Sequence, residues 1–365
     1  MALSPLFQPL PFDELPGWSS DQPAEAFAAF RRSALHVLTR NYRAGSLGVA
    51  AEAFSAAYEA ARGEAKPEPR GFFERWFIPC LVSPAPQDHG FVTGFYEPVA
   101  EASRVRTETF RYPLYARPPD LVELTAENRP AGMDSSYRFG RDAPSGIVAY
   151  FDRAAIERGA LEGRGLEIAW LSDPVDLFFI HVQGAARLDM IEGGTVRVTY
   201  AAKSGHPFTG PGGILRDLGE IPAQEITMQS IRAWFRANPS RRDEILHRNR
   251  SFIFFREAPA DDPLLGPVAA AKVPLTPGRS MAVDRELHTF GTPFFIDAPS
   301  LRAFDGSPFR RLMIAQDTGS AIVGPARGDL FAGTGHGAGE IAGIIRHAAD
   351  FYALLPRTLA ERATR

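Results

Sequence analysis

The chain of 365 residues has few of the groups on which several classes of protein depend. Cys80 is its only cysteine, so neither an intramolecular disulfide nor a metal cluster held by several thiolates can form. Lysine occurs at only three positions and the formal net charge is −3, which argues against a nucleic-acid partner. Apolar runs never approach the about 18 residues that a membrane-spanning helix requires.

The start of the sequence also lacks the features of a signal peptide. Residues 1–10 contain neither a basic segment nor a continuous apolar segment, and prolines interrupt them. We therefore expect no cleavable leader within the sequence as given. The length and a hydrophobic fraction of 45% suffice for a large core, and together they favour an ordinary globular protein of two domains.

Helical periodicity is strongest in the first ninety residues, where apolar side chains recur every three or four positions over 27–38 and 47–61. From Phe91 to about Tyr200 the period is mainly two, which predicts strands, among them 91–98 and 177–183. In the second of these strands an apolar face alternates with a more polar face, which carries His181 and Gln183 and could line a groove. Residues 117–146 are rich in proline and glycine and predict long loops.

The second half of the chain predicts a helix over 223–236 and a further helix opened by a variant capping box of Ser240 and Asp243. Strands are expected at 251–255, 272–283, 292–296, 311–315 and 321–323. Apolar residues at helical spacing over 339–355 predict a final helix that packs against this β structure.

The residues with most chemical potential lie near the C-terminus. Asp317 and Asp329 stand at the two ends of a short apolar segment, and a glycine-rich run, 333–339, follows at once. Glycine lets the backbone turn tightly or approach a ligand, while the aspartates supply ionisable groups. We therefore expect the reaction chemistry in this region.

Four other chemistries fit less well. Asp317-Thr318-Gly319 has the form of an aspartic protease loop, but such an enzyme needs two carboxylates from two such loops, and no second loop occurs. The run 333–338 fits the dinucleotide pattern G-x-G-x-x-A, yet too few residues follow for the remaining strand and acidic residue. Neither the H-E-x-x-H pattern of zinc enzymes nor the G-x-S-x-G pattern of serine hydrolases is present.

The carboxylates match a known family. Asp284, Asp317 and Asp329 resemble the three aspartates of the three-aspartate (3D) domain that closes the membrane-bound lytic murein transglycosylases of type A. Further segments resemble motifs of that family in the same order: 93–98 (TGFYEP), 182–184 (VQG), 200–206 (YAAKSGH), 228–231 (MQSI) and 249–255 (NRSFIFF). The resemblance extends over residues 90–355.

This resemblance implies a mainly β fold with helices, built from a double-psi β-barrel domain and an inserted second β-rich domain, with a groove between them. Domain A would comprise 1–98 and 260–365 and would contain the N-terminal helices, the barrel and the three-aspartate region. Domain B would comprise 99–259.

The resemblance also implies an enzyme that needs no cofactor and no metal. A lytic transglycosylase cleaves the β-1,4 bond between N-acetylmuramic acid and N-acetylglucosamine of peptidoglycan and forms 1,6-anhydromuramic acid. By motif position Asp329 would be the acid and base, with Asp317 and then Asp284 as neighbours that raise its pKa. The groove would be lined by Thr93, Gly94, Tyr96, Gln183, Gly184, Ser204, Gly205, Gln316, Thr318 and Gly319. A hydrolytic muramidase and a non-catalytic peptidoglycan-binding protein remain alternatives.

Two departures from the family pattern affect these expectations. Relatives carry a lipid-modified cysteine at the mature N-terminus, whereas the sole cysteine here lies far inside, so membrane anchoring is not supported by this sequence. Many relatives have Gly-Gly and a lysine after the first aspartate loop, where this chain has Gly319-Ser320 and Val323. The substrate still implies the periplasm, with outer-membrane association as an option.

Overall fold

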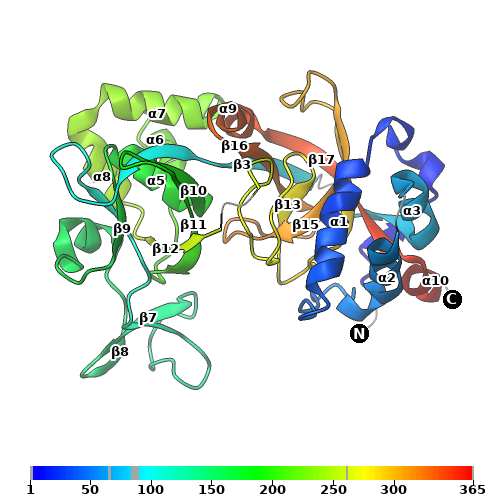
Figure 1. Ribbon diagram of the computed structural model, residues 1–365, viewed down its shortest axis with the longest axis horizontal. Coiled ribbons are helices and arrows are strands. Elements are labelled where there is room, and N and C mark those ends of the chain that lie inside the picture. The colour runs from blue at the N-terminus through cyan, green and yellow to red at the C-terminus, as the bar shows by residue number, and fades with distance from the viewer. Residues whose placement is uncertain (1–2, 65–66, 84–89, 260–261, 364–365) are drawn as a thin grey trace. The chain divides into compact units, whose positions relative to one another are not determined.

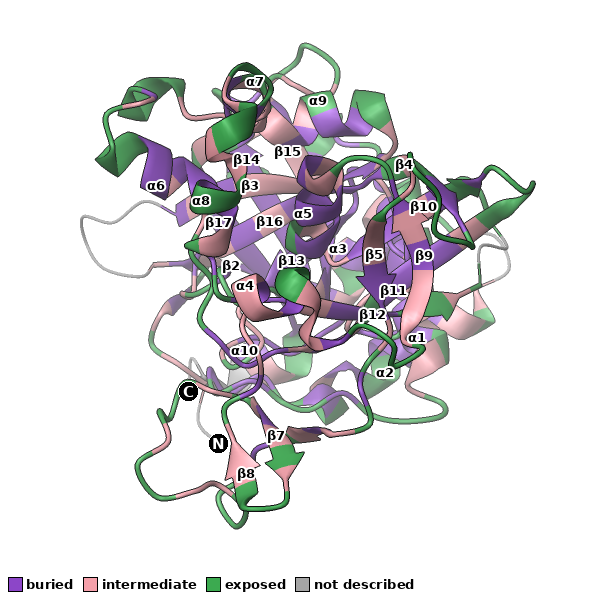
Figure 2. Ribbon diagram, turned by 90° about the vertical axis from the view of Figure 1, so that its left-hand side faces the viewer, coloured by how far each residue is buried: buried purple, intermediate pink, exposed green. Residues whose placement is uncertain are grey.

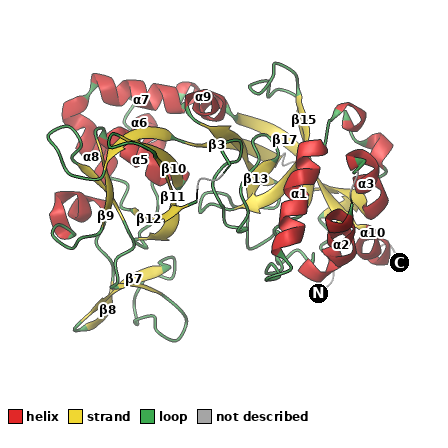
Figure 3. Ribbon diagram, in the orientation of Figure 1, coloured by secondary structure: helices red, strands yellow, loops and turns green. Residues whose placement is uncertain are grey.

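The computed structural model describes residues 3–64, 67–83, 90–259 and 262–363. The chain divides into two compact units, Met1–Tyr96 with Asp262–Arg365, and Glu97–Asp261. Both units contain β-sheet and helices (Figures 1 and 3). The expected mainly β class with helices is therefore confirmed. None of the helices in these ranges has the length and apolar character needed to cross a bilayer.

The first unit contains an eight-stranded sheet and five α-helices within its described residues. Its elements are β1 (Phe7–Pro9), α1 (Ala24–His36), α2 (Ser55–Gly63), α3 (Pro69–Trp76), β2 (Phe77–Val82), β3 (Gly90–Glu97), β13 (Ser280–Val283), β14 (Pro293–Ala298), β15 (Phe309–Asp317), β16 (Arg327–Thr334), α9 (His336–Ile344), β17 (Arg346–Pro356) and α10 (Arg357–Ala363).

The strand order in this sheet is β1-β2-β17-β14-β15-β13-β16-β3, and β17 also pairs with β3. That additional pairing, which aligns Arg346 with Thr93, closes a ring of six strands. Within the ring β13 runs parallel to β15 and antiparallel to β16. A closed ring pairs both edges of its sheet, so the strands that carry the candidate aspartates are hydrogen-bonded on both sides.

The core of the first unit lies on these strands. Every residue of β14 is buried (Figure 2). Among them, Phe294 and Phe295 are wholly inaccessible to solvent. Helix α1 packs against β15, as its predicted apolar face requires, and Phe30 contributes to the core with Phe73. Burial of such large side chains contributes roughly 1.5–3 kcal/mol each, which makes this layer a rigid support for the site.

The final helix predicted for 339–355 is wrong in its second half. Helix α9 ends at Ile344, Ile345 is extended, and the chain continues as β17. The last six residues of β17 are all buried, because the strand lies between β14 and β2. A strand buried on both faces is apolar without alternation, so periodicity alone does not distinguish it from a helix.

The second unit contains a six-stranded and a three-stranded sheet with α-helices around them. Its elements are β4 (Val99–Ser103), β5 (Tyr112–Tyr115), β6 (Leu121–Glu123), β7 (Phe139–Ala143), β8 (Gly146–Val148), α4 (Arg153–Ala155), β9 (Glu167–Leu171), α5 (Pro174–Gln183), β10 (Ala185–Met190), β11 (Thr195–Lys203), α6 (Pro211–Asp217), α7 (Met228–Ala237), α8 (Arg242–His247) and β12 (Ile253–Ala258).

The larger sheet has the order β12-β11-β10-β4-β9-β5, and the smaller sheet has the order β6-β7-β8. Apolar residues of α5 contribute to the core on the larger sheet through Leu177 and Ile180, and to a second core with α6, α7 and α8 through Phe178. Helix α5 is therefore the central element of this unit. Strands β6 and β7 of the smaller sheet fall within 117–146, so the prediction of long loops there was only partly right.

The strand predicted at 177–183 is wrong, because this segment is the body of helix α5. Pro174 occupies its first turn, the Asp173 side chain accepts a hydrogen bond from the Val175 amide at 2.7 Å, and Gly184 ends it with φ of 74°. These are ordinary helix start and stop signals. A short apolar run that is buried on all sides fits the periodicity of a helix and of a strand equally well, so the flanking residues must distinguish the two.

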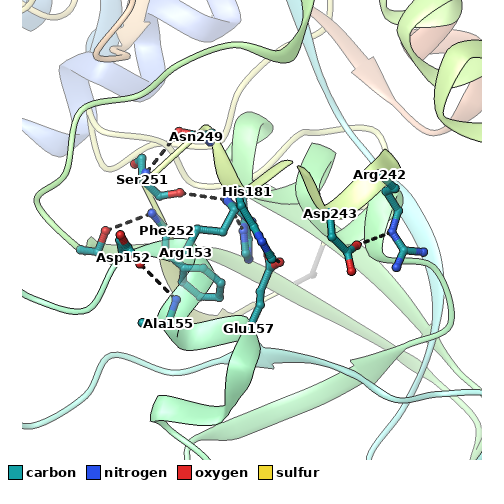
Figure 4. Close-up of polar contacts among 12 residues, drawn as sticks. Asp152, Arg153, Ala155, Glu157, His181, Arg242, Asp243, Asn249, Ser251 and Phe252 are labelled. Atoms are coloured by element: carbon teal, nitrogen blue, oxygen red, sulfur yellow. Dashed lines mark hydrogen bonds and ion pairs between the residues drawn. The ribbon is translucent and has the colours of Figure 1, made fainter. Parts of the chain in front are cut away.

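His181 is also not on a polar face. It is buried, its Nδ1 lies 3.1 Å from Nη2 of Arg153, and its ring lies edge-on to Phe252 (Figure 4). Burial first, and the Arg153 charge second, hold the pKa of His181 well below its usual range. Arg153 also donates to the Ser251 carbonyl at 2.9 Å, so the pair fixes the segment before β12 from inside the unit.

Other predictions had mixed outcomes. The helix predicted at 223–236 corresponds to α7, which begins only at Met228 and has a capping box formed by Thr227 and Ser230. Helix α8 begins at Arg242 and has no side-chain cap. The segment 321–323 is not a strand, and in 272–283 only the residues from Ser280 are extended. The strands at 91–98, 251–255, 292–296 and 311–315 correspond to β3, β12, β14 and β15.

Candidate active site

Two of the three candidate aspartates flank one alanine in the closed ring of strands. Asp317 ends β15, Asp329 lies in β16, and both are register partners of Ala282 in β13. Side chains of directly paired residues project to the same face of a sheet. The register between β13 and β15 shifts between Met281 and Ala282, and the charge of Asp329 acts on the Asp317 carboxyl, so the two carboxyls lie near each other on either side of Ala282.

Asp329 has the properties expected of a general acid. Burial, the largest cause, raises the pKa of its carboxyl, while the Thr93 hydroxyl and the Arg327 charge act in the opposite direction. The Thr93 hydroxyl donates to Oδ1 of Asp329 at 2.5 Å. A carboxyl that keeps its proton at higher pH than an exposed aspartate is suited to protonate a leaving group.

The pKa of the Asp317 carboxyl is raised to about 6. Burial is again the main cause; the amides of Thr318 and Ala270 lower the value, the charge of Asp329 raises it, and Lys272 lowers it. The sequence led us to expect Asp317 to raise the pKa of Asp329. Repulsion between the two carboxylates is mutual, so each disfavours the ionisation of the other, and burial is the largest cause of the raised pKa at both.

We expect replacement of Asp317 with asparagine to stabilise the protein at neutral pH. The folded-state pKa of about 6 lies above the value of ~3.9 for an unfolded aspartate, so ionisation costs stability as pH rises between these values. The shift corresponds to at most about 3 kcal/mol above pH 6 and to nothing below pH 4. Urea unfolding of both proteins from pH 4 to 8 measures this. A difference in stability that does not change with pH would contradict it.

Asp284 follows β13 and has both carboxylate oxygens engaged by backbone amides. Oδ1 accepts from the Glu286 amide at 3.0 Å and Oδ2 accepts from the Gly324 amide at 2.9 Å. The second bond ties the end of β13 to the loop that joins β15 to β16. These contacts favour a role in positioning that loop, and through it the spacing of the other two aspartates.

Gln316 was expected to line the groove, but the structure places its side chain in the protein interior. Its side chain is wholly buried: Oε1 accepts from the Ser280 hydroxyl at 2.6 Å, and Nε2 donates to the Ala29 carbonyl and the Ser33 hydroxyl at 2.8 and 2.9 Å. Successive residues of a strand face opposite sides, so the residue before Asp317 points toward α1 instead of toward the carboxyls. Its amide is not available to a sugar.

Three of the predicted groove residues lie on β3, and they have two different roles: Thr93 contacts the Asp329 carboxyl, whereas Gly94 and Tyr96 pack against α9. Thr93 contacts Asp329 directly. A Cβ on Gly94 would lie 2.9 Å from the Cα of Ala342, and one on Gly339 would lie 2.9 Å from the ring of Tyr96. Gly94 of β3 and Gly339 of the glycine-rich run therefore let α9 lie close on β3 and on the buried ring of Tyr96.

Thr318 and Gly319 follow Asp317 directly. The Thr318 hydroxyl donates to the Val283 carbonyl at 2.9 Å, which anchors the start of the loop to β13. Gly319 is exposed. Of the two, Gly319 leaves its backbone accessible beside the carboxyl of Asp317.

The other four predicted residues belong to the second unit. Gln183 ends α5 and is partly exposed, and Gly184 is the left-handed residue after it. The Ser204 hydroxyl is buried and accepts from the Phe252 amide at 3.1 Å, and a Cβ on Gly205 would lie 2.3 Å from the Phe139 carbonyl oxygen. The last two thus hold strands together, so the Ser204 hydroxyl is not exposed to a ligand.

One site residue was missed from the sequence. Arg327 lies two positions before Asp329 in β16 and donates to the Thr93 hydroxyl at 2.8 Å. Residues two apart in a strand share a face, so the pattern Arg327-Gly328-Asp329 within a β-rich segment was a usable signal.

Two family models match the chain, the MltA specific insert domain over residues 91–256 and the 3D domain over residues 279–355. Membrane-bound lytic murein transglycosylase A of Escherichia coli strain K12 is 33% identical over 260 residues, which make up 70% of this chain and 62% of that protein. The aligned region thus spans less than two thirds of the length of this relative.

Solved structures match over nearly the whole chain. A membrane-bound lytic murein transglycosylase from Agrobacterium tumefaciens has a TM-score of 0.92 and 50% identity, covering 98% of this chain and 99% of that one. MltA from Neisseria gonorrhoeae has a TM-score of 0.78 and 32% identity, covering 96% and 92%. Escherichia coli MltA with bound chitohexaose has a TM-score of 0.72 and 26% identity, covering 97% and 96%. The chain therefore belongs to the MltA family of membrane-bound lytic murein transglycosylases.

Proposed function

We propose that this protein is a lytic transglycosylase that cleaves the β-1,4 bond between N-acetylmuramic acid and N-acetylglucosamine in peptidoglycan. The observation that carries the proposal is the partly buried Asp329 carboxyl, which accepts a hydrogen bond from Thr93 and has a raised pKa, at the motif position of the last family aspartate. The names of the related proteins and the chitohexaose bound to Escherichia coli MltA support a glycan substrate.

The reaction needs only one catalytic carboxyl. Asp329 gives its proton to the bridging oxygen as the bond from that oxygen to C1 of the muramic acid breaks. The C6 hydroxyl of the same sugar attacks C1, and its proton passes to the Asp329 carboxylate, which restores the starting state. Attack from within the substrate has a high effective molarity, so neither a protein nucleophile nor a water molecule is consumed.

Asp317 acts as a supporting group in this scheme. Its interaction with Asp329 is electrostatic and mutual, so each carboxylate disfavours the ionisation of the other. Asp284 holds the intervening loop through the Gly324 amide. We assign the acid and base role to Asp329 and positioning or electrostatic roles to the other two.

We further propose that the six-stranded ring of the first unit is the double-psi β-barrel expected for domain A, residues 1–98 and 260–365, with 99–259 as inserted domain B. The closure of the ring through β17 and β3 supports this. Three of the predicted glycan contacts are at least partly exposed to solvent and remain proposed contacts: Gly319 of the first unit, and Gln183 and Gly184 of the second. We propose the periplasm as the location of the enzyme, because the proposed substrate lies there.

Digestion of purified peptidoglycan followed by mass analysis tests the proposal. We expect muropeptides that end in 1,6-anhydromuramic acid and are lighter by one water than hydrolysis products. Products with reducing ends would identify a muramidase instead. Binding to peptidoglycan without any release would identify a glycan-binding protein.

A further inference from the structure

Thr93 and Arg327 form a short chain of hydrogen bonds that ends at the Asp329 carboxyl. Arg327 Nη2 donates to the Thr93 hydroxyl oxygen, and the Thr93 hydroxyl contacts Oδ1 of Asp329. A guanidinium has donors only, and a threonine hydroxyl has a single hydrogen. With Arg327 donating to the oxygen, the hydroxyl hydrogen is directed at Oδ1 of Asp329.

Arg327 is itself fixed in place. Its Nη1 donates to the Gly328 carbonyl at 2.5 Å, and its guanidinium carbon lies 5.4 Å from the ring centre of Phe91. Phe91 and Thr93 are two residues apart on β3, and Arg327 and Asp329 are two residues apart on the neighbouring β16, so each pair lies on one face of its strand. Because the Thr93 side chain contacts those of Arg327 and Asp329, all four residues share one face of the sheet. The donor therefore reaches the hydroxyl from a supported position.

We propose that Arg327 and Thr93 are positioning residues that make Oδ1 of Asp329 a permanent acceptor, so that Oδ2 alone releases and regains the catalytic proton. The inference rests on the proposed function and assigns different roles to the two carboxyl oxygens of Asp329. It also reassigns Thr93, which the sequence placed among the glycan contacts.

The arrangement suits both halves of the reaction. In the first half Asp329 is protonated on Oδ2, the oxygen that Thr93 does not occupy. In the second half the carboxylate has one oxygen already hydrogen-bonded by Thr93 and the other vacant for the proton of the C6 hydroxyl. Because a hydroxyl that donates to a carboxylate favours the charged form, Thr93 also keeps the burial-driven rise in the pKa of Asp329 from becoming too large for a base.

The charged groups that act on this carboxyl come from two strands. Arg327 of β16 attracts the carboxylate, and Asp317 of β15 repels it. Thr93 of β3 is the neutral group between Arg327 and the carboxyl. A change at Thr93 leaves both charges in place, so it reports on the hydrogen bond itself.

Two readouts test the proposal, and only one of them needs catalysis. The first is the ionisation of Asp329, followed by NMR of its labelled carboxyl carbon without substrate. The second is the pH profile of kcat on soluble glycan strands. We expect Thr93→Val to raise the pKa of Asp329 by roughly one to two pH units and to lower kcat about tenfold to a hundredfold. Thr93→Ser, which keeps the hydroxyl, should remain close to the parent protein in both.

The coupling of the two residues is tested by a double substitution. Arg327→Met should shift the pKa of Asp329 in the same direction, in part through the lost charge and in part through the hydroxyl, and the part that acts through the hydroxyl should vanish in the Thr93→Val background. Arg346→Met is the matched control, because Arg346 is exposed and aligned with Thr93 on the other neighbouring strand. Independent, additive effects of Thr93→Val and Arg327→Met would overturn the proposal.

The failures of the two proposals are distinguishable. An unshifted Asp329 in Thr93→Val, with the parent protein still producing anhydro products, would overturn the hydrogen-bonded chain and leave the proposed function intact. A parent protein that produces no anhydro product would overturn the proposed function, while the NMR titration would still decide whether Thr93 and Arg327 control the carboxyl.

Discussion

Replacing Asp329 with asparagine should abolish the release of 1,6-anhydromuropeptides, with a loss of roughly 10³-fold or more in kcat. The amide oxygen of asparagine still accepts the Thr93 hydrogen bond, so the side chain keeps its place, but it has no proton to give or regain. The effect is expected to be large because one carboxyl performs both the acid and the base step. Product release measured by mass analysis at saturating glycan gives the value.

The same variant should fold at least as well as the parent protein. Burial raises the pKa of Asp329, so its ionisation costs stability, and asparagine removes that cost. Asp350→Asn on β17, which changes an exposed aspartate of the same unit, is the control and should keep full activity. Substantial activity of a well-folded Asp329→Asn protein would move the acid to another residue.

Replacing Glu97 with alanine should destabilise the second unit by about 3–5 kcal/mol. Arg187 of β10 and Arg197 of β11 are direct register partners, so their like charges oppose each other across the sheet. Glu97, wholly buried, joins both: its carboxylate lies 3.0 Å from Nε of Arg187 and 2.6 Å from Nε of Arg197. Without it the pair repels, and the charge of Arg197, which is only 3% exposed, loses its buried counter-ion.

Urea unfolding measures this effect, and two further variants interpret it. Glu97→Gln keeps the volume of the side chain and removes its charge, so the free energy of unfolding of this variant should fall between those of the alanine variant and the parent protein. Glu101→Ala, an exposed glutamate on the adjacent strand β4, should change the free energy of unfolding by no more than about 0.5 kcal/mol. A Glu97→Ala protein as stable as the Glu101→Ala protein would show that the carboxylate is dispensable.

The sequence indicated the important aspartates but not their geometry. Asp317 and Asp329 stood out because each has a glycine within two residues and fits a family motif, and the structure aligns both with Ala282. That alignment depends on β13 lying between β15 and β16, which is a pairing between distant segments. Nothing local to either aspartate encodes it, so the spacing of the carboxyls was not predictable.

The errors also have common physical causes. In α5 and in β17 the side chains are buried on most sides, so neither segment shows the contrast between apolar and polar faces that identifies an element. For Gln316 and Ser204 the motif was right but the role was not. Their polar groups satisfy buried backbone and side-chain partners, and a polar residue in a motif looks the same whether it bonds to protein or to ligand.

The central claim is that the substrate's own C6 hydroxyl, not water, completes the reaction under the control of one carboxyl. Digestion in water enriched in heavy oxygen tests it most directly, because only a hydrolytic step places solvent oxygen on C1. We expect the muropeptides to carry 1,6-anhydro ends with no heavy oxygen gained in the cleavage. Reducing-end products carrying one heavy oxygen would contradict the account.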